Sequence, residues 1–404
     1  MRIGLVADDV TGAMDTGVQF VLGGMRAVIL LDASEPPDVD AVAISTDSRA
    51  LAPADAYDRA QSAALRLPDR LLFKKLDGTM RGNVGAEIDG MLDALAWERA
   101  VVAPSGPQAG RTVAGGIHHV FGVPLAESSF AQDPLSPMRE SHLPTLLRGQ
   151  TKRRVGHLGL ETLESGVEAT IACLDRIDAE MVVCDAVTVD HLHTLALALP
   201  RLCVHWLPCG AAGLAREWIT AVAPEARWKP TPWVADPRPV LVVAGSRNPA
   251  THRQLMFCAR DRTINLLSLR PDSPMGGGRV DRMAAGMMQM GGNLALTTLY
   301  SAHVPGAEQT TAEMLARVTA RLLTRMPVAG LFLTGGDVAR AVCGELDASG
   351  LRIVGEVEPG VPAAELVGGA YHGLRVVTKA GGLGTDEVIS KSIRRLQGLA
   401  ESKA

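Results

Sequence analysis

Two adjacent aspartates follow the first apolar run of the sequence. Asp8 and Asp9 stand after residues 3–7, which predict a buried strand, and ahead of residues 12–22, which predict a helix. Neighbouring carboxylates in this position can accept hydrogen bonds from hydroxyl groups, or one of them can act as a general base. The alternative is a helix N-cap, which either Asp9 or Thr11 would supply. A cap accounts for one residue and leaves the pair unexplained.

The stretch FKKLDGTMRGN, residues 73–83, gathers charge and flexible backbone at a second strand-to-helix corner. Strand alternation sends Lys74 and Lys75 to opposite faces, so we expect one in solvent at the edge and the other in a ligand crevice. A helix N-terminus attracts anions, and the guanidinium of Arg81 can grip a carboxylate or a phosphate. Asp77 would repel that anion unless it serves a hydroxyl, so it is a candidate base. The stretch predicts a site for a small anion that bears a hydroxyl; a surface ion-pair network is the alternative.

A third segment, APSGPQAGRT at residues 103–112, follows the strand predicted at 100–103. Its prolines and glycines restrict the loop to an unusual path, and Arg111 is available for a further anion contact. An ordinary structured loop explains the same residues.

Three glycine-bearing segments in the second half of the chain each end an apolar run and open a helical pattern. They are VAGSRN at 243–248, LFLTGGDVARAV at 331–342 and VVTKAGGLGTDE at 376–387. Glycine lets backbone N–H groups approach phosphates closely, and Lys379 could neutralise them. Glycine also serves ordinary turns, so the prediction of a nucleotide site depends on all three segments together. Neither the Walker nor the Rossmann fingerprint is present.

Apolar runs alternate with helical patterns along most of the chain, which is typical of βαβ units. Five prolines between Pro224 and Pro239 interrupt this alternation and predict an interdomain linker. We expect an α/β protein of two domains, residues 1–235 and 236–404, each a mainly parallel sheet flanked by helices. Ligand sites are expected at the carboxyl ends of the strands and in the domain cleft. Strands of the first domain are predicted at 3–7, 39–45, 71–76, 100–103, 181–187 and 202–207.

The composition limits the classes of function. Lys plus Arg total 40 against 44 Asp plus Glu, a net charge of −4, which argues against the basic surface that broad nucleic-acid binding needs. The first ten residues do not resemble a signal peptide, and no apolar stretch is long enough to cross a membrane. The six cysteines form no CxxC pair and predict buried free thiols in a reducing compartment. We expect a cytoplasmic protein that binds neither nucleic acid nor membrane.

Six motifs occur in the order found in the four-carbon acid sugar kinases, and the chain resembles that family from residue 4 to about residue 384. They are ADDVTGAMD, KKLDGTMRGNVGAE, APSGPQAGRT, TGGDVARAV, EVEPGVP and TKAGGLG. Family members use ATP to phosphorylate the terminal hydroxyl of sugar acids such as threonate, erythronate or 3-oxo-tetronate. The resemblance therefore implies a kinase with a sugar acid and ATP as its small-molecule partners and Mg²⁺ as its metal.

The resemblance also implies which residues line the two sites. The acid site in the N-terminal domain would be lined by Asp8, Asp9, Lys75, Asp77, Arg81 and Asn83. The nucleotide site in the C-terminal domain would be lined by Ser246, Gly335, Gly336, Asp337, Lys379, Gly381 and Gly382. Lys75 and Arg81 would hold the substrate carboxylate. Either Asp77 or Asp9 would accept the proton of the attacked hydroxyl, and Asp337 is the candidate for organising Mg²⁺, directly or through water.

Two residues depart from the family pattern. Gly78 stands where the family usually has serine, and Val338 stands where it usually has threonine. Both changes remove a hydroxyl and neither removes a charge, so we expect activity to survive while the choice of acid stays open. If the changes are disabling, the alternative is a non-catalytic sensor that binds sugar acid or nucleotide. The oligomeric state is also open, a homo-oligomer included.

Overall fold

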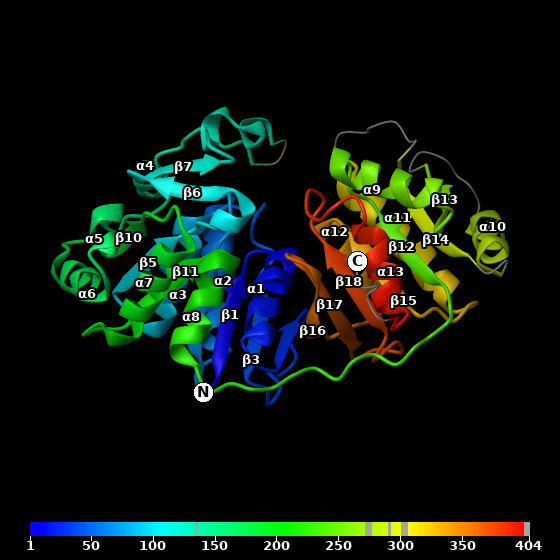
Figure 1. The fold of residues 1–404 in the computed structure, drawn as a ribbon, viewed down its shortest axis with the longest axis horizontal. Helices are drawn as coiled ribbons and strands as arrows, with labels where there is room; N and C mark the ends of the chain where they lie inside the picture. The colour runs from blue at the N-terminus through cyan, green and yellow to red at the C-terminus, as the bar shows by residue number, and fades with distance from the viewer. Residues whose placement is uncertain (134–135, 271–276, 290–291, 300–305, 400–404) are drawn as a thin grey trace. The chain divides into compact units, whose positions relative to one another are not determined.

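The computed structural model describes residues 1–133, 136–270, 277–289, 292–299 and 306–399. The chain divides into two compact units, drawn in Figure 1. Unit 1 comprises Met1–Ile29 and Glu35–Trp228, and unit 2 comprises Leu30–Ser34 and Lys229–Ala404. Between Pro224 and Pro239, where the prolines predict a linker, the chain forms neither helix nor strand.

Unit 1 is built on a parallel sheet whose strands end at one common edge. Seven of its strands pair in parallel with one another, and β2 (Ala27–Leu30) lies beside the first of them, β3 (Ala41–Ser45), at the margin. In spatial order the strands are β3 (Ala41–Ser45), β1 (Ile3–Ala7), β4 (Leu71–Lys75), β11 (Trp206–Gly210), β5 (Arg99–Ala103), β10 (Met181–Cys184) and β9 (Val155–Leu158).

Helices pack on this sheet in two groups. In one group α2 packs on α3 and α3 on α4; in the other α1 packs on α8, α8 on α7, and α7 on α6 and α5. Val84, Ile88, Met91 and Leu92 are all buried and form one apolar face of α3. The helices are α1 (Val10–Leu22), α2 (Pro53–Leu65), α3 (Val84–Leu95), α4 (Leu143–Arg148), α5 (Leu160–Glu164), α6 (Val167–Arg176), α7 (Val189–Ala198) and α8 (Ala212–Val222).

A small antiparallel sheet that the sequence patterns do not predict follows β5. It consists of β6 (Arg111–Ala114), β7 (Ile117–Val120) and β8 (Val123–Pro124). Single 3₁₀ turns flank it at Pro107–Ala109, Leu125–Glu127 and Ser129–Gln132. The loop predicted at residues 103–112 is therefore a short helical turn that leads directly into a strand.

The strands of unit 2 are mixed in direction. Its first five strands pair in parallel, and the last two are added antiparallel. In spatial order they are β13 (Ile264–Ser268), β14 (Asn293–Thr297), β12 (Val240–Ala244), β15 (Gly330–Thr334), β18 (Arg375–Lys379), β17 (Val361–Val367) and β16 (Gly350–Glu358). The helices are α9 (Pro249–Arg260), α10 (Gly277–Gln289), α11 (Glu308–Leu323), α12 (Gly336–Glu345) and α13 (Val388–Leu396). A core of strand residues such as Val242, Phe332 and Val377 packs against Ile389 and Leu396 of α13.

The predicted fold class is confirmed, since each unit is a mainly parallel sheet flanked by helices. The strand predicted at 202–207 is wrong in its position: residues 199–201 form a 3₁₀ turn, and β11 begins only at Trp206. Pro208 and Gly210 disguise this strand, because neither residue is usual in a central strand. The strand predicted at 181–187 ends at Cys184, since Asp185 leaves the sheet to bind backbone N–H groups.

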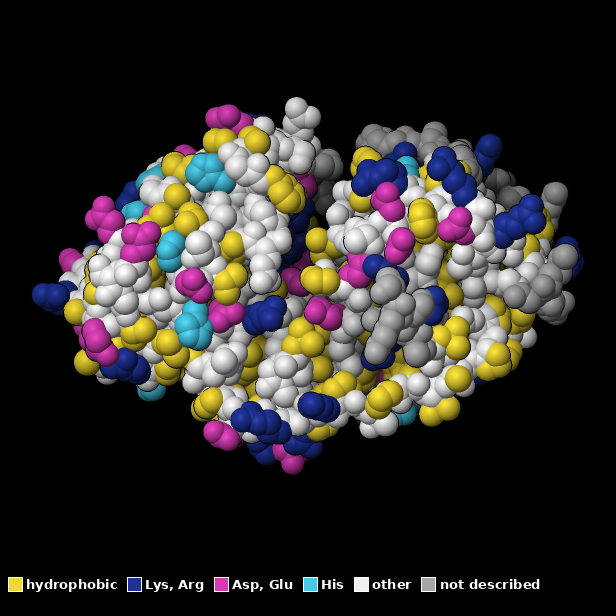
Figure 2. Space-filling model, viewed as in Figure 1, with side chains coloured by type: hydrophobic (Ala, Val, Ile, Leu, Met, Phe, Trp, Pro, Cys, Tyr) yellow, Lys and Arg dark blue, Asp and Glu magenta, His cyan; other side chains and the backbone are white. Residues whose placement is uncertain are grey.

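Acidic and basic side chains are interspersed on the face drawn in Figure 2, in keeping with the small net charge. In the described part of the chain, no helix combines the length and the apolar character that crossing a membrane requires. All six cysteines are free thiols; Cys203 is exposed, against the expectation of burial, and Cys173 is half-buried.

Candidate active site

Three neighbouring strands of unit 1 bring the predicted acid-site residues to one edge. The register pairs Ala7 of β1 with Ser45 of β3, and Val6 of β1 with Lys74 of β4. The segments that follow these strands therefore start side by side. Five of their side chains form what we call the carboxylate–arginine cluster: Asp8, Asp9, Arg49, Asp77 and Arg81.

Arg49, which the sequence patterns do not single out, is the centre of this cluster. Its Nε lies 2.6 Å from Asp8 Oδ2 and its Nη1 lies 2.9 Å from Asp9 Oδ2. Its Nη2 also lies 3.8 Å from Asp77 Oδ1, so one guanidinium joins three carboxylates. The signal that could have found it is its position four residues after a buried strand, in the segment TDSR. That signal is faint, because a single arginine in a loop is common.

Asp77 and Arg81 form a two-pronged ion pair within one turn of chain. Arg81 Nε and Nη2 donate to the two oxygens of Asp77 at 2.8 and 3.0 Å, and Arg81 Nη1 donates to Asp133 Oδ2 at 3.0 Å. The hydroxyl of Thr79 donates to Asp77 as well, at 2.6 Å. Burial opposes ionisation of Asp77, but Arg49 and Arg81 outweigh it and hold the pKa of this carboxyl well below its usual range.

Asp8 and Asp9 differ although they are adjacent. Burial raises the pKa of Asp9, and the neighbouring charge of Asp8 raises it further. Burial acts on Asp8 too, but there the Arg49 guanidinium prevails and lowers the pKa. Asp9 also caps α1, because its Oδ1 accepts the N–H of Gly12 at 2.7 Å. The predicted N-cap is therefore confirmed at Asp9, and the predicted contact of the pair with a hydroxyl stays a prediction.

The two lysines of β4 do lie on different sides, but the expected solvent-exposed lysine is wrong. Lys74 is completely buried, and its Nζ lies 2.6 Å from a carboxylate oxygen of Glu87 on α3. Lys75 is 4% exposed and donates to the carbonyl of Leu76 at 2.6 Å. β4 is a central strand covered on both faces, so neither side chain reaches open solvent. The positive charge of Lys75 acts on Asp9 and offsets part of the rise that burial causes in the pKa of Asp9.

Asn83 holds backbone in this structure. Its Nδ2 donates to the carbonyls of Ser48 and Leu51 at 3.2 and 2.8 Å. These bonds fasten the segment that carries Arg49 to the start of α3. Its expected contact with an acid substrate stays a prediction.

Three strand ends of unit 2 also lie side by side, as the glycine-bearing segments predict. The register pairs Ala244 of β12 with Thr334 of β15, and Thr334 with Lys379 of β18. Gly381 lies so close to the loop after β12 that a Cβ there would be 2.2 Å from Ser246 Oγ. Any side chain at residue 381 would require Ser246 to move. Gly382 lies beside Asn248, where a Cβ on the glycine would be 3.3 Å from Asn248 Nδ2.

Lys379 is the charged residue buried at this edge. It is 1% exposed, and its Nζ donates to the carbonyls of Ala380 and Gly381 at 2.9 and 2.8 Å. Among the described residues no carboxylate lies within ion-pair distance, and burial lowers the pKa of Lys379 to about 8. A buried ammonium without a negative partner favours an anionic ligand.

The glycines before α12 shape the remaining part of this edge. Gly335 has φ +105°, a backbone conformation that favours glycine, and its N–H donates to the carbonyl of Lys379 at 3.1 Å. Gly336 is the first residue of α12, and Asp337 follows with an exposed side chain. Val338 is buried, and its side chain lies 2.5 Å from the position that a Cβ on Gly245 would take. An apolar residue therefore packs the start of this helix.

The described residues provide no complete metal site of their own. No group of three or more His, Cys, Asp or Glu side chains in the described ranges could hold an ion. Mg²⁺ in phosphoryl-transfer enzymes takes one or two carboxylates and completes its shell with phosphate oxygens and water. A single exposed Asp337 at this edge fits that arrangement.

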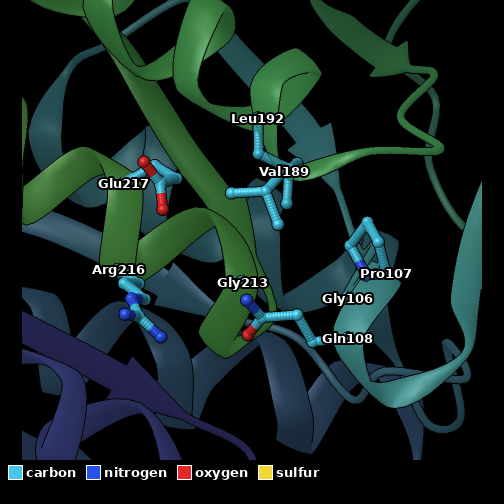
Figure 3. A pocket seen from close by; sticks show the side chains of 8 residues that line it. All are labelled: Gly106, Pro107, Gln108, Val189, Leu192, Gly213, Arg216 and Glu217. Carbon is cyan, nitrogen blue, oxygen red and sulfur yellow. The ribbon is translucent and has the colours of Figure 1, made fainter.

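A small cavity elsewhere in unit 1 contains none of these residues. It lies between the turn after β5 and the starts of α7 and α8, as Figure 3 shows. Its charged residues, Arg216 and Glu217, have opposite signs and both belong to α8. Its lining comprises Gly106, Pro107, Gln108, Val189, Leu192, Gly213, Arg216 and Glu217. It offers no concentration of charge comparable with the two strand edges.

Comparison with known proteins matches both units. Residues 3–218 match the sugar-binding N-terminal domain family and residues 241–389 match the nucleotide-binding C-terminal domain family. The chain is 36% identical to a D-threonate kinase of Bordetella bronchiseptica (99% of this chain, 98% of the relative). It is 33% identical to a D-threonate kinase of Salmonella typhimurium (97% and 98%). It is 30% identical to a D-erythronate kinase of Heliobacterium modesticaldum (95% and 94%).

A crystal structure of a protein from Salmonella typhimurium LT2 has the same fold, with a TM-score of 0.83 at 25% identity over 97% of this chain and 99% of that one. These curated relatives are named kinases, and the chain matches nearly the whole length of each. The alternative of a non-catalytic sensor is therefore not retained. The chain belongs to the four-carbon acid sugar kinase family.

Proposed function

We propose that this enzyme transfers the γ-phosphoryl group of ATP to the terminal hydroxyl of a four-carbon sugar acid, with D-threonate as its first expected substrate. The observation that carries the proposal is the carboxylate–arginine cluster, which offers acceptors for hydroxyls beside cations for a carboxylate. D-threonate is favoured over D-erythronate because the relatives at 33% and 36% identity are D-threonate kinases, and the D-erythronate kinase is 30% identical.

In the acid site, Asp9 is the proposed general base. A base must be able to take up a proton, and the raised pKa of Asp9 favours this, whereas the lowered pKa of Asp77 does not. Asp9 is also more accessible, with 24% of its side chain exposed against 12% for Asp77. Asp77 would instead orient Arg81, and Asp8 would hold Arg49 in place. Arg81, Lys75 and Asn83 are proposed to lie beside the acid.

In the nucleotide site, Lys379 would bind the phosphates of ATP, because its buried charge has no partner of opposite sign among the described residues. The close approach of Gly381 to Ser246 would leave backbone N–H groups available to phosphate oxygens. Gly335, Gly336 and Gly382 would complete this surface. Mg²⁺, when bound, would offset phosphate charge, with Asp337 as its protein ligand.

The test is a panel of acids incubated with enzyme, ATP and Mg²⁺ while ADP is measured. The panel contains D-threonate, L-threonate, D-erythronate and 3-oxo-tetronate, and a blank without acid. ADP formation that depends on one acid, with D-threonate fastest, supports the proposal. Equal ADP formation in the blank would indicate plain ATP hydrolysis and contradict it. Asp9→Asn enzyme is the matched control for contaminating kinases.

A further inference from the structure

The hairpin of β6 and β7 is held in a fixed position over the end of the main sheet. Asp185, directly after β10, accepts the N–H groups of Gly115 and Gly116 in the hairpin turn at 2.7 and 2.9 Å. Both glycines have positive φ, so the turn depends on them. His157 contacts the same carboxylate at 2.8 Å. The turn is therefore anchored by a buried carboxylate and is not a free loop.

A second anchor joins this hairpin to the Asp77 turn. His118 of β7 is completely buried, and its Nε2 lies 2.9 Å from the carbonyl oxygen of Gly78. Burial lowers the pKa of His118 to about 4, so the ring is neutral near pH 7 and its Nε2–H donates to that carbonyl. The strand that pairs with β7 begins at Arg111, opposite Val120. The hairpin thus carries Arg111 toward the carboxylate–arginine cluster.

Arg111 and Arg81 share one aromatic ring. The Cζ atoms of the two guanidinium groups lie 5.4 and 5.3 Å from the ring centre of Phe130, and Arg111 also lies 5.1 Å from the ring centre of Phe121. Burial lowers the pKa of Arg111, the negative charge of Asp77 raises it in part, and the like charge of Arg81 lowers it. Burial disfavours the charge of Arg111 more than Asp77 supports it, so an anion beside the guanidinium would offset that cost.

The two arginines differ in how many of their donors are used. Arg81 already forms ion pairs with Asp77 and Asp133. Arg111 donates to the carbonyl of Ala109 at 3.0 Å, and within the described ranges no carboxylate lies at ion-pair distance from it. Its planar fork is held by two aromatic rings and keeps donors for a second planar group.

We infer that Arg111 is the residue that recognises the carboxylate of the substrate acid, presented by the anchored hairpin beside the carboxylate–arginine cluster. This inference builds on the proposed function. It moves the main carboxylate contact from Lys75 and Arg81 to a residue on another element. Lys75 and Arg81 then act mainly within the protein, where the hydrogen bonds already engage them.

The test compares an acid with the polyol that lacks its carboxylate. Wild-type, Arg111→Gln and Arg111→Lys enzymes are assayed with D-threonate and with D-threitol as phosphoryl acceptors. Arg99→Gln is the matched control: Arg99 also stacks on an aromatic ring, at 5.2 Å from Trp206, and also donates to one backbone carbonyl, that of Leu174, but it begins β5 at the opposite end. Circular dichroism and Tm identify any variant that has lost its fold, and Arg111→Lys, which keeps the charge, then carries the comparison.

We expect Arg111→Gln to lower kcat/KM for D-threonate about 10- to 100-fold, the loss of a charged hydrogen-bond partner, and to leave D-threitol nearly unchanged. Arg111→Lys should lie between, and Arg99→Gln should match the wild type. An unchanged ratio of the two acceptors in folded Arg111→Gln would overturn the inference. An equal fall for both acceptors would also overturn it, because it would assign Arg111 to the transferred phosphate.

The two proposals fail in different ways. If the wild type forms no ADP with any acid, the proposed function is wrong, and calorimetric binding of D-threonate still tests Arg111. Weaker binding to Arg111→Gln than to Arg99→Gln would then support the inference, and equal binding would refute it.

Discussion

Arg49 Nε lies 2.6 Å from Asp8 Oδ2, and this contact joins the segments that follow two neighbouring strands. The side chain of Asp8 is only 4% exposed, so contacts within the protein, and not water, stabilise its negative charge. The same guanidinium reaches Asp9 and Asp77. One cation therefore contacts three carboxylates, and its charge favours the ionised form of each.

Replacing Arg49 by glutamine should remove that charge. We expect kcat/KM to fall at least about 100-fold and the free energy of unfolding to fall by about 2 to 3 kcal/mol, because a buried carboxylate loses its partner. Urea unfolding and steady-state kinetics measure the two effects. Arg2→Gln is the control, since its ion pair with Asp38 is exposed and should contribute less than about 1 kcal/mol. An Arg49→Gln enzyme as active and as stable as the control would disprove the central role of Arg49.

Asp9→Asn and Asp77→Asn should behave differently. Asparagine caps a helix as well as aspartate, so Asp9→Asn should keep its stability while kcat falls about 10²- to 10⁴-fold. Asp77→Asn breaks the ion pair with Arg81, so it should raise KM and lower Tm. Its kcat should fall less than the kcat of Asp9→Asn. In the wild type, kcat/KM should fall toward acidic pH as Asp9 takes up its proton, since its pKa is raised. Full turnover by Asp9→Asn would exclude Asp9 as the base.

Removing one partner of the buried ion pair between Lys74 and Glu87 should lower stability more than replacing both partners. Both side chains are nearly inaccessible, and Ser48 donates to the same Glu87 carboxylate at 2.6 Å. Glu87→Leu or Lys74→Met alone should lower the free energy of unfolding by about 3 to 5 kcal/mol. The double variant Lys74→Met with Glu87→Leu should be clearly more stable than the sum of the single losses. Urea unfolding of all variants tests this, and strict additivity would contradict a direct charge pair.

Because of Lys379, both the free energy of unfolding and the affinity for nucleotide should change with pH in the alkaline range. Its folded pKa of about 8 is below the ordinary value of 10.5, so between these values the unfolded chain binds a proton that the folded chain does not. The free energy of unfolding should therefore rise with pH across this window, as the cost of a buried charge disappears.

Binding of a non-hydrolysable ATP analogue should change in the opposite sense. The charged ammonium attracts phosphate, so affinity should weaken as the pH rises above about 8. Calorimetry between pH 7.5 and 10 measures this. Lys379→Met should bind weakly at every pH, whereas Lys391→Met, which loses a partly exposed lysine of the same unit, should keep the wild-type profile. A pH-independent affinity in the wild type would remove Lys379 from the phosphate site.

The sequence patterns predict the strand ends at the two candidate sites well, because glycines and charges at the end of an apolar run are local signals. Ala244, Thr334 and Lys379 do lie in register, and Asp8 does follow a buried strand. Alternation also separates Lys74 from Lys75. It cannot tell that helices cover both faces of β4, so the exposure of one lysine is predicted wrongly.

Contacts between distant segments are what the sequence does not predict. Asp133 reaches Arg81 across 52 positions, and no pattern marks that pairing. Arg49 is inconspicuous until the register places β3 beside β1. The hairpin that carries Arg111 is hidden for a similar reason, since its strands are short and its anchors, Asp185 and His118, come from outside the motif that contains Arg111.

The position of the new phosphate in the product tests the central claim most directly. The enzyme, ATP, Mg²⁺ and D-threonate are incubated, and the product is observed by phosphorus NMR with proton coupling. Transfer to the terminal hydroxyl predicts a phosphomonoester signal split by the two methylene protons of the last carbon. A signal split by one methine proton, or inorganic phosphate as the sole product, would contradict the account.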